Sequence, residues 1–347
     1  MYKKLKSWLF RFVVVFVPTV IGLFVVVFVL AYQERLVRDP ITGQIRFQRP
    51  PLYLQEPNYE KTGHKYLYDA RLGWKNIPNW KWTSWGEKLT INSHGLRDQE
   101  HTYQKPPGAR RILVLGDSYA WGYGVADDAL FTEVLEQRLS GQQVDWEVIN
   151  TGVSGWGTDQ ELLFLEQEGF KYQPDIVVLT FFIGNDPANN SASRQYGLNK
   201  PLFVDTDLKL VNVPVPKPDK QSSVINSSAD AGELTLAIIQ RMADVCAEHD
   251  CDLFVLKFGE FLFEDTGPFE DLRKRMATRV PQLPRTTYVD VDQVYLDREI
   301  APMEILVGNN DGHWNPYGHW LTADVLLNTL VESGDIVSDD IRSVDGR

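Results

Sequence analysis

Two segments far apart in the chain carry the residue types of a serine nucleophile and its general base. Ser118 follows a Gly-Asp pair directly after an apolar run, and His313 stands two residues after Asp311 near the C-terminus. A serine hydroxyl is a weak nucleophile at neutral pH, so it needs a general base, and that base needs a third group that holds its tautomer. Asp311 is close enough in sequence to orient the imidazole of His313. A histidine in a loop could instead cap the following helix, which is the interpretation we favour for His319.

The residues around Ser118 predict a strand, a sharp turn and a helix. Residues 112–115 are all apolar, as in a strand that is buried on both faces. Gly116 permits a tight turn, and Asp and Ser favour helix N-termini. Apolar residues at helical spacing follow within 130–139. This arrangement places a serine hydroxyl at the carboxyl end of a parallel sheet, where ligands bind in open α/β folds. An ordinary strand-to-helix turn is the alternative.

Four more strands, separated by helical patterns, predict an α/β fold with a parallel sheet. The first two of them end in polar turns that contain glycine, one over residues 151–160 and the other at Gly184-Asn185-Asp186. This alternation predicts βαβ units with right-handed crossovers. The predicted strands cover 146–150, 176–183, 253–258 and 287–291, and helical patterns cover about 162–165, 234–249, 269–277 and 321–330.

Four motifs occur in the order that is typical of one enzyme family. They are Gly116-Asp117-Ser118, Asn150-x-x-x-x-Gly155, Gly184-Asn185-Asp186 and Asp311-x-His313-Trp314-Asn315. With these motifs, the chain resembles the SGNH/GDSL hydrolases over about residues 111–334. The resemblance implies a flavodoxin-like three-layer α/β/α domain and an activity that uses neither a cofactor nor a metal.

The resemblance also implies a role for each matching residue. Ser118 would be the nucleophile, His313 the general base and Asp311 the group that orients His313. The backbone amides of Ser118 and Gly155 and the side-chain amide of Asn185 would form the oxyanion hole, which stabilises the negative charge that acyl transfer develops on a carbonyl oxygen. The chain departs from the family in one place. The family often has its aspartate three residues before the histidine, whereas an asparagine holds that position here.

Residues 12–32 form an uncharged apolar run that predicts a single transmembrane helix. A run of 21 residues reaches roughly 30 Å as a helix, which is enough to cross a bilayer core. Basic residues within 1–11 favour a cytoplasmic N-terminus and therefore a periplasmic or extracellular catalytic domain. A cleaved signal peptide is the competing interpretation, but no small-x-small site follows the run. The motif Asn92-x-x-Gly95-Leu-Arg97 also looks like the lead-in of bacterial family members that are often membrane-anchored or associated with exopolysaccharide.

Residues 33–110 have a different composition, rich in Pro, Tyr, Trp and Arg. They predict a linker followed by a small β-rich segment of short hairpins, with a strand over 88–92 and a turn over 93–95. The tryptophans of this segment could stack on sugar rings, but we favour a role in filling a small core. They are Trp74, Trp80, Trp82 and Trp85.

Two other segments and the two cysteines leave alternatives open. Residues 187–232 are rich in Asn, Ser, Asp and Pro and follow a strand, so they form a lid beside the site, a disordered loop or a short hairpin. Residues 335–347 form a polar tail. Cys246 and Cys251 match no zinc or redox motif and are either unrelated thiols or a short-range disulfide.

The net charge and the motifs that are absent argue against several classes of function. A net charge of -12 argues against nucleic-acid binding. The sequence has no P-loop and no His/Cys ligand cluster, although Asp117 and Asp186 in isolation could be read as metal ligands. We expect a membrane-anchored serine esterase that removes acyl groups, chiefly acetyl, from a cell-surface or secreted glycan. The alternatives are an O-acyltransferase that uses the same site with a membrane acyl-donor partner, and a non-catalytic glycan-binding or assembly protein.

Overall fold

The five predicted strands form one parallel sheet. The computed structural model describes residues 16, 18–26, 28–29, 36–38, 45–47, 66–84, 87–139, 144–217, 223–263, 266–307 and 312–336. The order across the sheet is β15-β14-β9-β7-β8, and every neighbouring pair is parallel. Numbered along the chain, these strands lie in the order 2-1-3-4-5, which is flavodoxin-like. The strands are β7 (Arg110–Gly116), β8 (Trp146–Asn150), β9 (Ile176–Phe182), β14 (Asp252–Phe258) and β15 (Thr286–Asp290).

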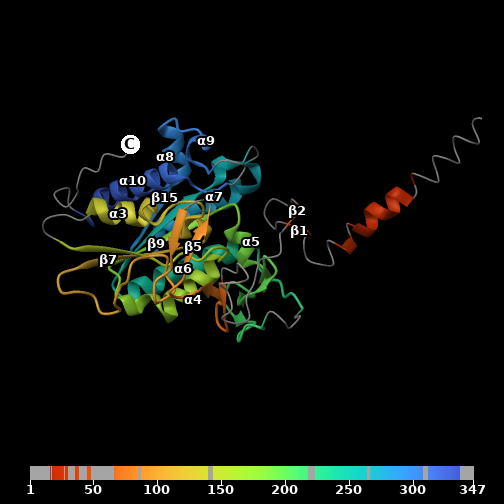
Figure 1. The fold of residues 1–347 in the computed structure, drawn as a ribbon, viewed down its shortest axis with the longest axis horizontal. Coiled ribbons are helices and arrows are strands. Elements are labelled where there is room, and N and C mark those ends of the chain that lie inside the picture. Colours follow the sequence, from red (N-terminus) through yellow and green to blue (C-terminus); the bar gives the residue numbers. More distant parts are fainter. Residues whose placement is uncertain are drawn as a thin grey trace, which may run out of the picture.

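Helices cover both faces of this sheet, and Figure 1 shows α3 and α10 on one side and α4 and α6 on the other. Because successive side chains of a strand point to opposite faces, β7 contributes to two cores. Leu113 and Leu115 pack with α4, α6 and α7, whereas Ile112 and Val114 pack with α3, α8 and α10. The domain therefore has the expected three-layer α/β/α architecture. The covering helices are α3 (Phe131–Leu139), α4 (Thr158–Gln167), α6 (Ala231–Glu248), α7 (Gly267–Arg279), α8 (Val291–Asp297) and α10 (Pro316–Glu332).

Helix α10 begins where the sequence favours it, and it carries His319. The side chain of Asn315 accepts the backbone amide of Gly318 at 2.9 Å, and proline occupies the first helical position. His319 lies in the first turn of α10, and its Nδ1 accepts the amide of Phe131 at 3.1 Å, where α3 begins. The expectation that His319 is a loop residue that caps the following helix is therefore wrong: His319 lies within α10 and caps the earlier helix α3.

Short helices connect the main elements. One of them, α2, starts at Ser118 and directly follows β7. Helix α2 spans Ser118–Trp121. The other short helices are α5 (Asp186–Asn190), α9 (Pro302–Ile305) and the 3-10 helices η2 (Asp127–Ala129), η3 (Gly169–Tyr172), η4 (Glu260–Leu262) and η5 (Val280–Gln282).

The segment before the sheet forms three antiparallel hairpins, as its composition predicts. The strand expected over 88–92 is β6, which pairs with β5, and the turn over 93–95 follows it. Trp74 and Trp80 are buried, which confirms a core role for both, whereas residue 85 and the side chain of residue 82 lie outside the description. The strands are β1 (Leu36–Arg38), β2 (Ile45–Phe47), β3 (Tyr66–Asp69), β4 (Gly73–Asn76), β5 (Lys81–Ser84) and β6 (Glu87–Thr90).

The predicted transmembrane segment lies only partly within the described residues. Residues 16, 18–26 and 28–29 are helical. Within the part of the chain that the structure describes, no helix is long and apolar enough to cross a membrane. The transmembrane helix over 12–32 therefore stays a prediction.

The insertion over 187–232 folds into short hairpins in its described parts, 187–217 and 223–232. Its strands pair β10 with β11 and β12 with β13. The expected alternative of a hairpin is thus correct, and the insertion also lies beside the candidate site described below. Its strands are β10 (Arg194–Gln195), β11 (Leu198–Asn199), β12 (Leu202–Phe203) and β13 (Leu210–Val211).

The two cysteines and the C-terminal segment complete the fold. Cys246 and Cys251 are buried free thiols. Of the two alternatives, unrelated thiols are therefore correct and the short-range disulfide is wrong. Ile336 is buried in the core, and the carbonyl of Asp335 accepts a hydrogen bond from Arg110 at 2.7 Å. The predicted tail therefore begins later than residue 335, and residues 337–347 lie outside the description.

Candidate active site

Ser118 lies at the carboxyl end of β7, on a turn that only glycine permits. A Cβ built on Gly116 would lie 1.9 Å from Oγ1 of Thr180 in the neighbouring strand. Asp117 then caps the short helix α2, because its Oδ1 accepts the amide of Tyr119 at 2.9 Å. The strand, turn and helix expected around Ser118 are therefore present, and they fix the hydroxyl at the sheet edge.

His313 lies within hydrogen-bonding distance of Ser118, although 195 residues separate them. The distance from Nε2 of His313 to Oγ of Ser118 is 2.7 Å. The hydroxyl of Tyr119 donates to the carbonyl of Gly312 at 2.6 Å. The imidazole also contacts the rings of Tyr119 and Tyr123, at centroid distances of 5.0 and 4.9 Å. The residue next to the serine thus fastens the loop that carries the histidine. Asp311 lies outside the described residues, and its orienting role stays a prediction.

Gly155 lies in the turn after β8, the strand beside β7. Its φ of +83° is in the left-handed region, which favours glycine. The amide of Val153 donates to the carbonyl of Gly116 at 3.1 Å, and this bond ties the turn to the serine's own turn. Among the hydrogen bonds of the described residues, the backbone amides of Ser118 and Gly155 donate to no protein acceptor. Both predicted oxyanion-hole amides therefore keep their donors available.

Asn185 follows β9, the strand on the other side of β7. Its Nδ2 donates to Oδ2 of Asp117 at 2.9 Å. Burial raises the pKa of Asp117, while the hydrogen bond from Asn185 opposes this shift. The three turns after β8, β7 and β9 thus bring Gly155, Ser118 and Asn185 together, as parallel strands with adjacent carboxyl ends should.

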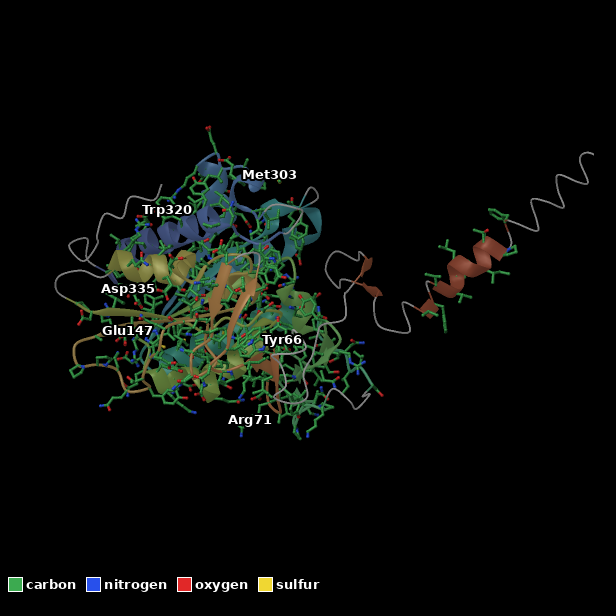
Figure 2. All side chains as sticks on the ribbon, viewed as in Figure 1. Tyr66, Arg71, Glu147, Met303, Trp320 and Asp335 are labelled. Carbon is green, nitrogen blue, oxygen red and sulfur yellow. The ribbon has the colours of Figure 1, made fainter. Side chains whose placement is uncertain are left out.

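These residues open onto one cavity of about 480 Å³. Its remaining walls are largely aromatic, and the aromatic residues come from four separate parts of the chain. Figure 2 shows one of these residues, Tyr66, well away from Glu147, near the amino end of β8, and from Asp335, whose carbonyl accepts from Arg110 at the amino end of β7. The lining consists of Tyr66, Trp74, Ser118, Tyr119, Tyr123, Ser154, Gly155, Phe182, Asn185, Tyr196, Leu198, Gly312 and His313.

The comparison with protein families decides the assignment. A model described as the GDSL-like lipase/acylhydrolase family matches residues 114–321, which is more than half of the chain. The chain belongs to this family. The matched range begins inside β7 and ends in α10, so it contains each of the four motifs.

Solved structures resemble this GDSL-like acylhydrolase only distantly. A protein of the G-D-S-L family from Desulfitobacterium hafniense shares 14% identity over 63% of this chain and 99% of its own, with a TM-score of 0.43. An acetylxylan esterase from Geobacillus stearothermophilus shares 13% over 70% of this chain and 100% of its own, with a TM-score of 0.44. A two-domain esterase active on acetylated mannans shares 15% over 68% of this chain and 52% of its own, at 0.43. No curated protein sequence matches the chain.

A cluster of buried carboxyl groups lies beneath the site of this GDSL-like acylhydrolase. Glu161 is fully buried, and neither of its carboxyl oxygens has a hydrogen-bond partner among the described residues. Burial raises the pKa values of Glu161 and Asp186 well above their usual range, and nearby carboxylates, including Asp117, raise them further. Among the described residues, no set of three or more acidic, His or Cys side chains is arranged to hold a metal ion.

Sequence reasoning did not assign to the cavity the four residues that come from the hairpin segment and the insertion, and it favoured a core role for Trp74 over contact with a sugar. Trp74 belongs to the hairpin segment, yet its Nε1 donates to the carbonyl of Ser154 at 3.1 Å. The carbonyl of Trp74 in turn accepts a hydrogen bond from Nε1 of Trp156 at 2.9 Å. These bonds bind β4 to the turn that carries Gly155. The other missed residues are Tyr66, Tyr196 and Leu198. Tyr196 follows β10 and Leu198 begins β11, and both strands have only two residues, which is too short to show a period. Only the Tyr-Gly pair at 196–197 signals the turn between them.

Proposed function

We propose that this chain is a serine ester hydrolase that acts on an acyl ester, chiefly acetyl, of a cell-surface or secreted glycan. The observation that carries the proposal is the 2.7 Å contact between Oγ of Ser118 and Nε2 of His313. This contact lies in the same cavity as Gly155 and the side chain of Asn185. A nucleophile, a base and donors that converge on one cavity are the parts that acyl transfer requires.

The proposed reaction has two halves. Oγ of Ser118 attacks the ester carbonyl carbon while its proton passes to Nε2 of His313. The carbonyl electron pair moves onto oxygen, which receives hydrogen bonds from the amides of Ser118 and Gly155 and from Asn185. The tetrahedral intermediate collapses and expels the alcohol, which takes the proton from His313. Water then repeats these steps on the acyl-enzyme, and Asp311 is proposed to hold the imidazole throughout.

The cavity walls support a small acyl group on a sugar. Flat aromatic rings offer apolar surfaces to the C–H faces of a sugar, and tyrosine also supplies a polar group at the end of its ring. Burial raises the pKa values of Tyr66 and Tyr196 to about 12, so both hydroxyls keep their protons at neutral pH. These walls come from the hairpin segment and from the insertion, which lie outside the four motifs. The specificity for the alcohol is therefore proposed to depend on them.

The N-terminal run supports a location on the outer side of a membrane. Residues 12–32 are uncharged and follow a basic segment, which favours a single-pass anchor with the catalytic domain in the periplasm or outside the cell. Protease added to intact spheroplasts should degrade the domain if this topology is correct. A domain that is protected until the cells are lysed would contradict it.

Labelling with a fluorophosphonate probe tests the proposed nucleophile. We expect the full-length protein in detergent to be labelled, and Ser118→Ala and His313→Ala to lose both labelling and ester cleavage, with kcat lower by roughly 10⁴ to 10⁶. Ser333→Ala, which removes a hydroxyl at the end of α10, is the matched control and should label normally. A folded wild-type protein that is never labelled would contradict the proposal. Adding an acetylated glycan and a sugar acceptor to the same assay distinguishes hydrolysis from acyl transfer.

A further inference from the structure

Tyr196 occupies an unusual position for a large side chain. It forms the turn between β10 and β11 with Gly197, and the two residues have φ values of +52° and +79°. Two consecutive left-handed residues make the type of two-residue hairpin turn that favours Asn and Gly. A tyrosine there costs roughly 1–2 kcal/mol of backbone energy. The insertion therefore holds this aromatic ring in place at a conformational cost.

The ring of Tyr196 lies against Gly155. The position that a Cβ on Gly155 would occupy is 3.1 Å from Cδ2 and 3.2 Å from Cε2 of Tyr196. Only a glycine at residue 155 leaves the ring this much room. Tyr196 is therefore a neighbour of the residue whose amide is proposed to bind the oxyanion.

The hydroxyl of Tyr196 has a proton to donate. Its oxygen accepts hydrogen bonds from Nδ2 of Asn185 at 3.5 Å and from Nδ2 of Asn189 at 3.4 Å. An amide nitrogen has no lone pair that accepts a hydrogen bond, so the phenolic proton must point away from both amides. No acceptor among the described residues takes that proton. Tyr196 lines the cavity that Ser118, His313 and Asn185 also line, and its hydroxyl oxygen contacts the amide of Asn185 there.

We propose that Tyr196 is a catalytic residue that supplies a fourth hydrogen bond to the oxyanion. When Oγ of Ser118 bonds to the carbonyl carbon, the π pair moves onto the carbonyl oxygen and the serine proton moves to His313. Asn185 keeps its 2.9 Å bond to Asp117 and turns its second Nδ2 proton from the Tyr196 oxygen, which it reaches only at 3.5 Å, to the carbonyl oxygen. The Tyr196 O–H donates to the same oxygen and keeps its own proton throughout. The inference rests on the proposed function, and it makes the insertion part of the catalytic apparatus.

The contacts also predict the size of the effect. Removal of one preset oxyanion donor lowers kcat by roughly 10² to 10³ in a well-studied protease. The Tyr196 oxygen is held by two long hydrogen bonds, so we expect a smaller loss, of about 10- to 100-fold. Because the oxyanion exists only in the transition state and the intermediate, the loss should fall on kcat rather than on KM.

The test compares two tyrosine-to-phenylalanine variants of the full-length protein with 4-nitrophenyl acetate. Tyr196→Phe removes the proposed donor and keeps the ring, and we expect kcat to fall about 10- to 100-fold with KM changed less than about threefold. Tyr68→Phe is the matched control. Its hydroxyl donates to the carbonyl of Val215 in the same insertion, at 2.5 Å, and Tyr68 does not line the cavity. We expect its kcat to stay within about twofold of wild type.

Each outcome decides the inference. Wild-type kcat in Tyr196→Phe overturns it, as does a rise in KM alone, which would mean that the ring only shapes the cavity. An equal loss in Tyr68→Phe also overturns it, because the effect would then come from a loosened insertion. The rate of fluorophosphonate labelling, with the melting temperature as a check on folding, gives a second measurement and should fall only in Tyr196→Phe. A wild-type protein that neither labels nor hydrolyses ester overturns the proposed function, and this inference with it.

Discussion

The side-chain amide of Asn185 donates to the carboxylate of Asp117, the residue directly before Ser118, at 2.9 Å. This bond joins the carboxyl ends of β9 and β7. The other oxygen of Asp117 accepts the amide of Tyr119 and so caps the helix that begins at Ser118. One buried carboxylate therefore sets the position of the nucleophile's helix and the direction of the proposed oxyanion donor.

Asp117→Asn should lower activity through Asn185. The two carboxylate oxygens of Asp117 accept one hydrogen bond each, from the amide of Tyr119 and from Nδ2 of Asn185. Asparagine has only one acceptor oxygen, so Nδ2 of Asn185 loses its hydrogen-bond partner. We expect kcat to fall about 10-fold with little change in KM, while Asn185→Ala should lower kcat by roughly 10² to 10³. If Asp117 acts by positioning Asn185, then adding Asp117→Asn to Asn185→Ala should cost little more. Fully additive losses in this double-mutant cycle would contradict the positioning role.

Gly155→Ala should reduce both activity and stability. Alanine at φ +83° costs roughly 1–2 kcal/mol, and its Cβ would press on the ring of Tyr196 at 3.1 Å. We expect kcat to fall at least about 10-fold because the loop or the ring must shift. Gly108→Ala is the matched control. Gly108 has φ +82° with nothing within 4 Å of the added Cβ, so this variant should lose similar stability and keep its activity. Equal activity in the two variants would contradict the prediction.

Lys200→Met should destabilise the insertion and the domain. Nζ of Lys200 pairs with the carboxylate of Asp159 at the start of α4 and also donates to the carbonyl of Asn189 at 3.0 Å. Both charged side chains are buried. Breaking a buried pair leaves one uncompensated charge, which costs roughly 3–5 kcal/mol. Urea unfolding measures the loss.

The control for Lys200→Met is an exposed ion pair. Arg241 pairs with Glu166 at 2.9 Å, with its side chain 40% exposed. Pairs of this kind contribute less than about 1 kcal/mol, so Arg241→Met should be nearly neutral. Losses of equal size in the two variants would mean that Lys200 stabilises the fold no more than a surface charge does.

The sequence predicted the sheet and the residues at its carboxyl edge because both depend on local patterns. Residues 112–115 and 176–183 are apolar runs whose ends coincide with glycine-bearing turns, so each strand fixes where its polar residues emerge. The four motifs then brought Ser118 and His313 together before any contact was known. Their spacing in the sequence alone could not show that His313 lies beside Ser118 in space, and this expectation came from the family resemblance.

The cavity walls could not be predicted because they depend on tertiary contacts. Trp74 looked like a core residue, and it is buried, but it also lines the cavity because β4 is hydrogen-bonded to the turn of Gly155. Tyr196 reaches the site through a left-handed turn that sequence reasoning would assign to Asn or Gly. Glutamate is almost never fully buried, and nothing in the residues around Glu161 signals that it would be, yet it is fully buried.

His319 should make the protein sensitive to mild acid. Burial lowers its pKa to about 3, and its Nδ1 is occupied by the amide of Phe131. In the unfolded chain the pKa is about 6.5. Below that value the unfolded state binds a proton that the folded state does not, so stability falls as the pH decreases from about 6.5 towards 3.

Replacing His319 isolates this contribution. Between pH 7 and pH 5 the group should remove about 2 kcal/mol of stability from the wild-type protein. His319→Gln keeps an acceptor for the amide of Phe131 but does not titrate, so its unfolding free energy should fall by about 2 kcal/mol less over the same interval. Urea unfolding of both proteins at pH 5, 7 and 8 measures the difference. Between pH 7 and pH 8 the difference should stay constant, because the histidine is neutral in both states there. A difference that is also constant from pH 7 to pH 5 would show that His319 binds a proton in the folded protein as readily as in the unfolded chain.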